Sequence, residues 1–375
     1  MGLELADLFR HYGSAYRARY ADRLLPSHRQ AMRAIEQCRT EALGGQVYTC
    51  SQCDQVQYRY HSCRNRHCPK CQHEQAQQWL EKQRELLLPV PYFLLTFTLP
   101  AALRPLARQQ QKLFYHLLFR ASAAATQQLA RDPRFIGGQI GLVGVLHTWT
   151  RDLRYHPHVH YLAPAGGLAA EGQTWVAARK NFLLPVRALS RLFRGRFQRA
   201  LQKTDAYALV PSRVWQQDWV VHCKPVGTGQ TALKYLAPYI FRVALSNRRL
   251  VKVDNDQVTF RYTEAKSGQT KFCTLPAEQF IHRFLQHVLP RGFVKVRYYG
   301  LFSPGSRKRL ALLQRQLGQP SSIGVTPDPP QATEPVSTPT PPPSSEADAA
   351  RCPVCGGVMR LRAILRPPAR WAKPP

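Results

Sequence analysis

The stretch His147-Thr-Trp-Thr-Arg-Asp-Leu-Arg-Tyr-His156-Pro-His158-Val-His160-Tyr-Leu162 carries four histidines between two apolar runs. These runs, Ile140–Trp149 and His158–Leu162, predict two β-strands because they are short, apolar and rich in β-branched and aromatic residues. The polar connection between them, Thr150–Pro157, is typical of an antiparallel pair. The stretch therefore predicts a β-hairpin within an α+β protein.

The same hairpin predicts a metal site. Alternate side chains of a strand share one face, so His158 and His160 project together. His147 ends the preceding strand, and in a hairpin it can converge on the other two. Three neutral imidazoles leave a divalent ion with open positions, as catalysis requires. His156 competes for a ligand position if the strand starts early, although Pro157 disfavours an early start.

Acidic residues are scarce around these histidines. Asp152 is the single acid between Arg134 and Gly166. This disfavours a nuclease in which clustered carboxylates hold two magnesium ions.

The overall charge points to a polyanionic partner. The chain has 375 residues, with 53 Lys plus Arg against 22 Asp plus Glu, a net charge of +31 and a pI near 10.3. Nucleic acid is the usual partner of so basic a protein. No apolar run approaches the roughly 18 residues of a membrane-spanning helix, and the N-terminal residues do not resemble a secretion signal. We therefore expect a DNA-binding protein of the reducing cytoplasm.

Cysteines predict a structural zinc site in such a compartment. Cys50-Ser-Gln-Cys53 and Cys68-Pro-Lys-Cys71 are two Cys-x-x-Cys knuckles, and four thiolates form a closed tetrahedral shell for zinc. The predicted ligands are Cys50, Cys53, Cys68 and Cys71, with Cys63 and His67 as alternatives. Small buried hydrophobic residues are the competing interpretation of these cysteines.

Two tyrosines follow later in the chain. Tyr235 and Tyr239 stand four residues apart, a spacing that places both on one face of a helix. A phenol can attack a phosphodiester, although two tyrosines at this spacing are more often core residues. Pro238 between them predicts a kink that could displace Tyr239.

Basic residues beside both motifs are the predicted DNA contacts. They are Arg64, Arg66 and Lys70 near the cysteines, and Lys234, Arg242, Arg248 and Arg249 near the tyrosines.

The chain is expected to fall into five parts. They are a helical and zinc-binding DNA-recognition domain over 1–90, a catalytic domain over 91–250, an α+β extension over 251–318, a disordered Pro-, Ser- and Thr-rich linker over 319–350, and a basic tail over 351–375. The tail carries Cys352-Pro-Val-Cys355, half of a zinc knuckle. This pair could complete a site with another chain or stay vacant.

Taken together, the motifs resemble the two-tyrosine transposases of rolling-circle insertion sequences, of the insertion sequence 91 type. These belong to the HUH endonucleases. The resemblance covers about residues 1–318 and is carried by Ser62-Cys-Arg-Asn-Arg-His-Cys-Pro-Lys-Cys71, His156-Pro-His-Val-His160 and Tyr235-Leu-Ala-Pro-Tyr239.

The resemblance implies a central antiparallel sheet flanked by helices, in a bacterial cytoplasmic enzyme. It places the metal-binding pair on His158 and His160, the nucleophiles on Tyr235 and Tyr239, and a third ligand on His147. It implies Mg²⁺ or Mn²⁺ for catalysis, structural Zn²⁺, and cleavage of single-stranded or hairpin DNA at element ends through a 5′-phosphotyrosine. A plasmid replication or mobilisation nuclease and a non-catalytic zinc-dependent DNA-binding regulator are the alternatives.

Overall fold

The computed structural model describes residues 2–71, 83–228, 231, 244–264, 267–318 and 351–368. It divides into two compact units, the first made of Met1–Glu36 and Arg64–Gly318 and the second of Gln37–Cys63 and Gln319–Pro375. The predicted linker over 319–350 lies outside the described residues. Among the residues described, no helix has the length and apolar character that crossing a membrane requires.

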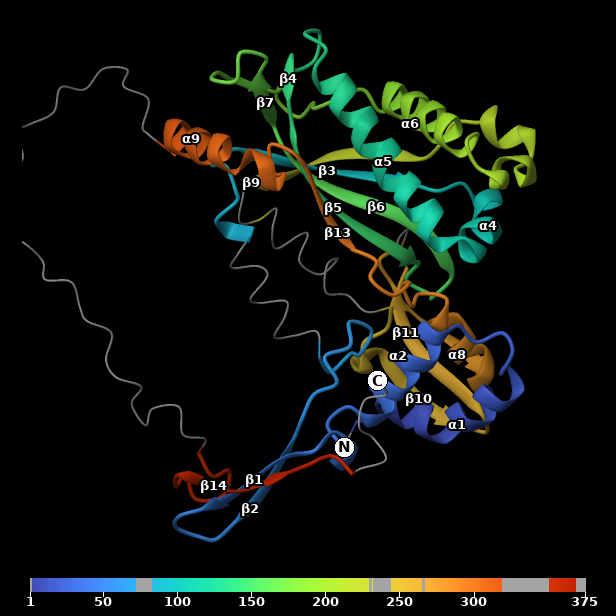
Figure 1. Cartoon of the computed structure of the whole chain (residues 1–375), viewed down its shortest axis with the longest axis vertical. Coiled ribbons are helices and arrows are strands. Elements are labelled where there is room, and N and C mark those ends of the chain that lie inside the picture. The colour runs from blue at the N-terminus through green and yellow to red at the C-terminus, as the bar shows by residue number, and fades with distance from the viewer. Residues whose placement is uncertain are drawn as a thin grey trace, which may run out of the picture. The chain divides into compact units, whose positions relative to one another are not determined.

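A five-stranded antiparallel sheet, in the order β13-β5-β6-β3-β9, organises the first unit (Figure 1). Its strands are β3 (Pro91–Thr98), β5 (Gly141–Trp149), β6 (Tyr155–Pro164), β9 (Val221–Thr228) and β13 (Val296–Gly300). The hairpin predicted from the histidine stretch is β5–β6, at the middle of this sheet. The expected α+β class with a central antiparallel sheet is confirmed.

The β6 strand begins at Tyr155, earlier than predicted, and so contains Pro157. The β5–β6 pairing passes from His147↔His158 to Trp149↔Tyr155 through a register shift. Such an irregularity accommodates a residue that has no N–H to donate. The Pro157 carbonyl still accepts a hydrogen bond from the Leu99 N–H, at 3.0 Å.

One face of the sheet is covered by helices. The short helix α4 (Arg104–Gln109) leads into α5 (Gln111–Ala130), which packs beside α6 (Val186–Leu201) (Figure 1). Phe97 of β3 lies 5.2 Å from Phe193 of α6, ring centre to ring centre. This is the main hydrophobic core of the protein.

The opposite face changes character along the strands. At one end, Leu94, Val145 and Leu162 form a second core with Leu310 and Leu313 of α9 (Arg307–Gly318). Further along the same face the ladder reads Thr96↔His160 and Thr98↔His158, so polar side chains replace apolar ones. The histidines therefore lie on the face that α5 and α6 leave uncovered.

A smaller α+β part completes the first unit. It contains α1 (Leu5–Arg19), α2 (Pro26–Gln37), the three-stranded sheet β10 (Leu250–Asp254), β11 (Gln257–Thr263) and β12 (Thr270–Pro276), and α8 (Ala277–Leu285). Helix α1 packs against α8, with the Phe9 and Phe284 ring centres 5.4 Å apart. A further small sheet consists of β4 (Gly138–Gln139), β7 (Gly166–Ala169) and β8 (Trp175–Ala177).

The second unit is a three-stranded antiparallel sheet in the order β14-β1-β2. The hairpin β1 (Gly45–Cys50) and β2 (Val56–Tyr60) receives β14 (Met359–Leu365), from the far end of the sequence, along its β1 edge. The tail is thus a strand of the cysteine-bearing hairpin rather than a separate segment.

Candidate metal centres

Three histidines converge at the end of the β5–β6 hairpin. Ring centres are separated by 5.4 Å for His147 and His158, 5.0 Å for His147 and His160, and 4.8 Å for His158 and His160. One ring nitrogen of each lies within 4.8 Å of the others. Cross-strand pairing explains the convergence, because His147 stands opposite His158 and His160 follows on the same face. The predicted spatial arrangement is therefore present.

Hydrogen bonds orient two of these rings. His158 Nδ1 donates to the His156 carbonyl oxygen at 2.6 Å, and His160 Nδ1 is hydrogen-bonded to Thr96 Oγ1 at 3.0 Å. With Nδ1 engaged, Nε2 is left as the nitrogen with a lone pair for a metal. His156, the predicted competitor, contributes its backbone carbonyl and stands outside the group of three.

Burial keeps the imidazoles of His158 and His160 neutral. Desolvation lowers the pKa of His158 to about 4 and holds the pKa of His160 well below its usual value. Neutral imidazole is the form that binds a metal. The donor set thus fits a divalent ion with open coordination positions.

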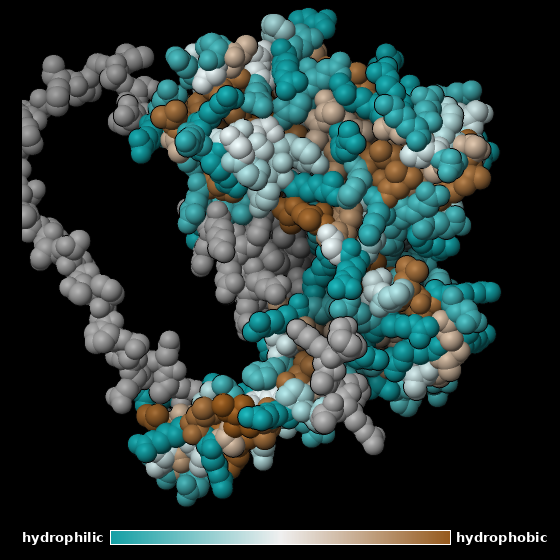
Figure 2. Space-filling model, in the orientation of Figure 1, coloured by the Kyte–Doolittle hydropathy of each residue, from teal (hydrophilic) through white to brown (hydrophobic). Residues whose placement is uncertain are grey.

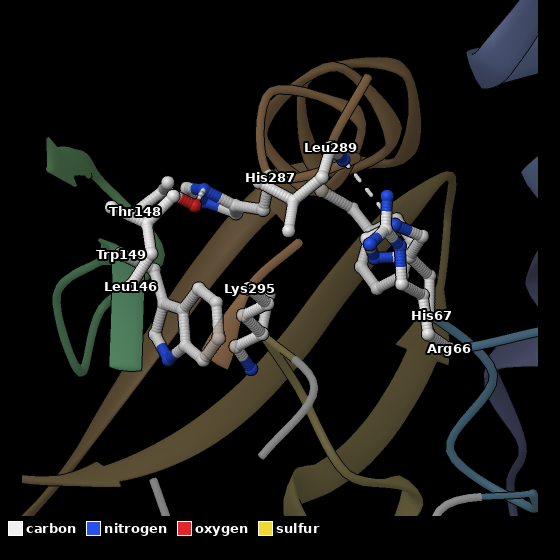
Figure 3. A pocket seen from close by; sticks show the side chains of 10 residues that line it. Arg66, His67, Leu146, Thr148, Trp149, His287, Leu289 and Lys295 are labelled. Carbon is white, nitrogen blue, oxygen red and sulfur yellow. Dashed lines mark hydrogen bonds between the residues drawn. The ribbon is translucent and has the colours of Figure 1, made fainter. Parts of the chain in front are cut away.

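A cationic pocket lies beside this centre (Figure 3). Trp149 stacks on His147, with ring centres 4.9 Å apart, and Lys295 Nζ lies 5.2 Å from the Trp149 ring centre. Arg66 and His67 form the facing wall in Figure 3. The described residues that line the pocket include the basic side chains of Arg66 and Lys295 and no carboxylate. Such a lining suits an anion.

The walls of this pocket are held rigidly. The Arg66 guanidinium donates to the carbonyls of Pro290, at 2.9 Å, and Phe293. His67 Nε2 accepts a hydrogen bond from the Leu289 N–H at 3.3 Å. Burial lowers the pKa of Lys295 to about 7, with the nearby Arg66 charge adding to the effect. No motif in the sequence signals this pocket, because its residues come from distant segments.

The predicted tyrosine nucleophiles, Tyr235 and Tyr239, lie outside the described residues, as do Lys234, Arg242 and Pro238. The chain is described up to Thr228 at the end of β9 and again from Ala244. Ala244 lines the cationic pocket. The described chain therefore resumes beside the cationic pocket.

The remaining predicted DNA contacts fall into two groups. Arg64 and Arg248 are exposed. Lys70 instead forms an ion pair with Glu4, and Arg249 donates to the carbonyls of Arg261 and Ala244, at 2.9 and 3.4 Å. Arg249 therefore has a structural role in this fold.

The structure corrects the predicted zinc ligand set. Cys50 and Cys53 gather with Cys352 and Cys355, not with Cys68 and Cys71. The reason is the pairing of β14 with β1, which brings the tail knuckle to the hairpin knuckle. Two sulfur–sulfur distances in this group are 3.4 Å for Cys50–Cys355 and 3.6 Å for Cys53–Cys352. Backbone N–H groups of residues 52 and 53 lower the pKa of Cys50, whereas hydrogen bonds with the neighbouring thiols raise the pKa of Cys53, so the sulfurs of this group titrate together.

Cys68 and Cys71 lie in the first unit and keep the form of a knuckle. Both are buried, and the Cys71 N–H donates to the Cys68 carbonyl at 3.2 Å. The alternative ligand His67 is instead committed to Leu289. Cys63 stays a predicted ligand for this pair.

The comparisons with known proteins agree with this architecture. Residues 8–99 match the family model described as "Transposase zinc-binding domain", and residues 141–309 match the one described as "Putative transposase". The chain is 44% identical, over 82% of both sequences, to "Putative transposase y4qJ" of Sinorhizobium fredii. The chain belongs to the insertion sequence 91 family of transposases.

A second relative is the "Transposase for insertion sequence element IS801" of Pseudomonas savastanoi pv. phaseolicola. It is 29% identical over 71% of this chain and 68% of its own length. No solved structure matches the transposase. The resemblance to this family, found first in the cysteine, histidine and tyrosine motifs, is confirmed. Transposases act on DNA, and the zinc expected for this family fits the cysteine clusters.

Proposed function

We propose that this transposase cuts and rejoins one DNA strand at the ends of its element, through a tyrosine nucleophile. The observation that carries the proposal is the convergence of His147, His158 and His160. A purely DNA-binding regulator has no use for three histidines gathered around one point, two of which burial keeps neutral. A plasmid replication or mobilisation nuclease would share this chemistry, but both similar proteins are named as transposases.

The histidines would hold a divalent ion through their Nε2 atoms. Imidazole nitrogen suits transition ions better than Mg²⁺, which prefers oxygen, so Mn²⁺ is the better fit of the two predicted ions. When bound, such an ion supplies Lewis-acid polarisation of the scissile phosphate.

The tyrosines supply the covalent step. The phenolic oxygen of Tyr235 or Tyr239 forms a bond to phosphorus, and the bond from phosphorus to the 3′ oxygen breaks. The phenol loses its proton as it attacks, the leaving 3′ oxygen takes up a proton, and the 5′ end stays attached as a phosphotyrosine. The second tyrosine then serves the strand transfer, so one centre handles donor and target in turn.

The cationic pocket supports the DNA side of this proposal. Arg66 and Lys295 line a cavity that adjoins the metal-centre side chain His147 through Trp149. Their positive charge beside the histidine centre would favour the approach of a DNA phosphate to that centre.

The test is covalent capture. Purified protein is incubated with a single-stranded element-end oligonucleotide and Mn²⁺, and denaturing gels are examined for a protein–DNA adduct. We expect the adduct with the wild type and with His116→Ala, which alters an exposed histidine of α5 on the opposite face. It should vanish in His158→Ala. Cleavage by the Tyr235→Phe/Tyr239→Phe double variant would refute the nucleophile assignment.

A further inference from the structure

We propose that the C-terminal tail supplies half of a structural zinc site, whose other half is the N-terminal hairpin of the same chain. The four ligands are the thiolates of Cys50, Cys53, Cys352 and Cys355, all within 4.8 Å of one another. Neither family model reaches the tail, because the zinc-binding match ends at residue 99 and the transposase match at residue 309.

The sulfur geometry fits a tetrahedral ion. With Zn–S bonds of about 2.3 Å, the edges of a thiolate tetrahedron are about 3.8 Å long. The observed 3.4 Å for Cys50–Cys355 and 3.6 Å for Cys53–Cys352 are close to that length and far from a disulfide bond. All four cysteines are free thiols. Four soft sulfur ligands select zinc and leave no open position, so the site is structural.

Backbone contacts seat the tail on the hairpin beside the ligands. The Ser51 N–H of the hairpin donates to the Val358 carbonyl of the tail at 3.0 Å. Within the tail, the Cys352 N–H donates to the Gly357 carbonyl at 2.8 Å and closes the turn of the knuckle. Gly356 adopts a φ of +75°, which favours glycine at the turn. A Cβ on Gly357 would stand 3.1 Å from Cys50 Sγ, so a glycine allows the close approach of the two knuckles.

The second unit also needs such a zinc cross-link between the tail and the hairpin, which we call the clasp. Its described residues form a hydrophobic cluster of three buried members, Cys50, Cys352 and Met359, with Tyr48 packed against them. Apolar side chains of β14 are instead on the surface, with Leu361 51% and Ile364 67% exposed. Figure 2 shows apolar residues, in brown, on the surface of the molecule. A sheet with so small a core requires a staple, and a metal is a common one. Zinc binding would therefore supply most of the free energy that holds β14 in place.

The clasp has a consequence for DNA binding. It adds the exposed Arg360 and Arg362 of β14 to a sheet that already presents Arg59 on β2. The basic tail thereby becomes part of the zinc-binding domain's surface.

Metal counting on the full chain tests the proposal. Zinc per chain is measured by elemental analysis for the wild type, Cys50→Ser/Cys53→Ser, Cys352→Ser/Cys355→Ser and the quadruple variant. One shared ion predicts that each double variant loses one zinc and that the quadruple variant loses no more. Cys273→Ser, in β12 and outside the cluster, should lose none. A loss of two ions in the quadruple variant, or of none in the tail variant, would overturn the proposal.

A second measurement covers the case in which a variant misfolds. A protease site is inserted between residues 319 and 350 of the wild type, and the cut protein is passed over a sizing column with mass detection. The tail fragment should stay with a monomeric body in zinc and separate after chelation. Separation in the presence of zinc, retention after chelation, or retention in dimers alone would contradict a clasp within one chain. Transposition activity plays no part in either readout, so a failure here is distinct from a failure of the cleavage mechanism.

Discussion

Thr96 Oγ1 lies 3.0 Å from His160 Nδ1, across the β3–β6 ladder in which the two residues are directly paired. This contact determines which nitrogen of His160 faces the centre, because a ring whose Nδ1 is hydrogen-bonded presents Nε2. A threonine on a neighbouring strand thus orients a metal-binding candidate without touching the metal.

Replacing Thr96 with valine should weaken Mn²⁺ binding by about 10- to 100-fold, the usual cost of losing such a partner. Valine keeps the shape and the β propensity and removes the hydroxyl. Thr96→Ser keeps the hydroxyl and should retain most of the affinity. Calorimetric titration with Mn²⁺ measures both variants. Equal affinities would show that the hydroxyl does not orient the ring.

Metal binding should be insensitive to pH across the neutral range. Burial lowers the pKa of His158 to about 4, so protons compete with the metal at this residue only as the pH falls toward that value. We expect a flat Mn²⁺ affinity from pH 8 to about pH 5.5 and a decline below it. Titrations at a series of pH values in constant ionic strength measure this. A decline centred near pH 6.5 would mean that the imidazoles titrate as exposed histidines do.

We expect the buried Lys295 to lower the folding stability of the transposase and to contribute to DNA binding. Its pKa falls from 10.5 to about 7 on folding, because burial disfavours the charge. Between those two pH values the unfolded chain binds more protons than the folded chain, so the free energy of unfolding rises by up to about 1.4 kcal/mol per pH unit. Below pH 7 the full cost of burying the charged lysine is present. Lys295→Met should therefore raise the melting temperature at pH 7, flatten the slope between pH 7 and 10, and weaken oligonucleotide binding.

The matched control for Lys295 is Lys203→Met, an exposed lysine that follows α6 on the helix-covered side. It should change neither the pH slope of stability nor the oligonucleotide affinity. If Lys295→Met lowers stability at pH 7, the burial of this lysine is compensated in the folded protein.

Substitutions of two adjacent arginines should have different effects, one on DNA binding and the other on folding stability. Arg248 is exposed, and Arg248→Ala should weaken single-stranded DNA binding, reduce its salt dependence by about 0.7 in log–log slope, and leave the melting temperature unchanged. Arg249 donates to backbone carbonyls, and Arg249→Ala should cost roughly 1–3 kcal/mol of folding stability. Fluorescence anisotropy at several salt concentrations and thermal melting measure the pair. A reversed pattern would exchange the two roles.

The sequence determined the histidine centre because its three histidines are close together in the chain. His158 and His160 alternate on one strand, and a short connection brings His147 opposite them, so strand geometry alone predicts the convergence. The sequence also identified the family through the spacing of its cysteine, histidine and tyrosine motifs, because their chemistry requires particular residue types at particular spacings. The antiparallel class followed from the same hairpin.

Only the tertiary structure decided how the cysteines are grouped and where the cationic pocket forms. Cys50 and Cys355 are 305 positions apart, and no periodicity in a sequence reveals that β14 pairs with the β1 edge. The two Cys-x-x-Cys pairs nearest in sequence were therefore combined wrongly. Arg66, Trp149 and Lys295 likewise meet only because their segments pack together. Local patterns specify local geometry, whereas long-range partners depend on which surfaces the whole chain buries.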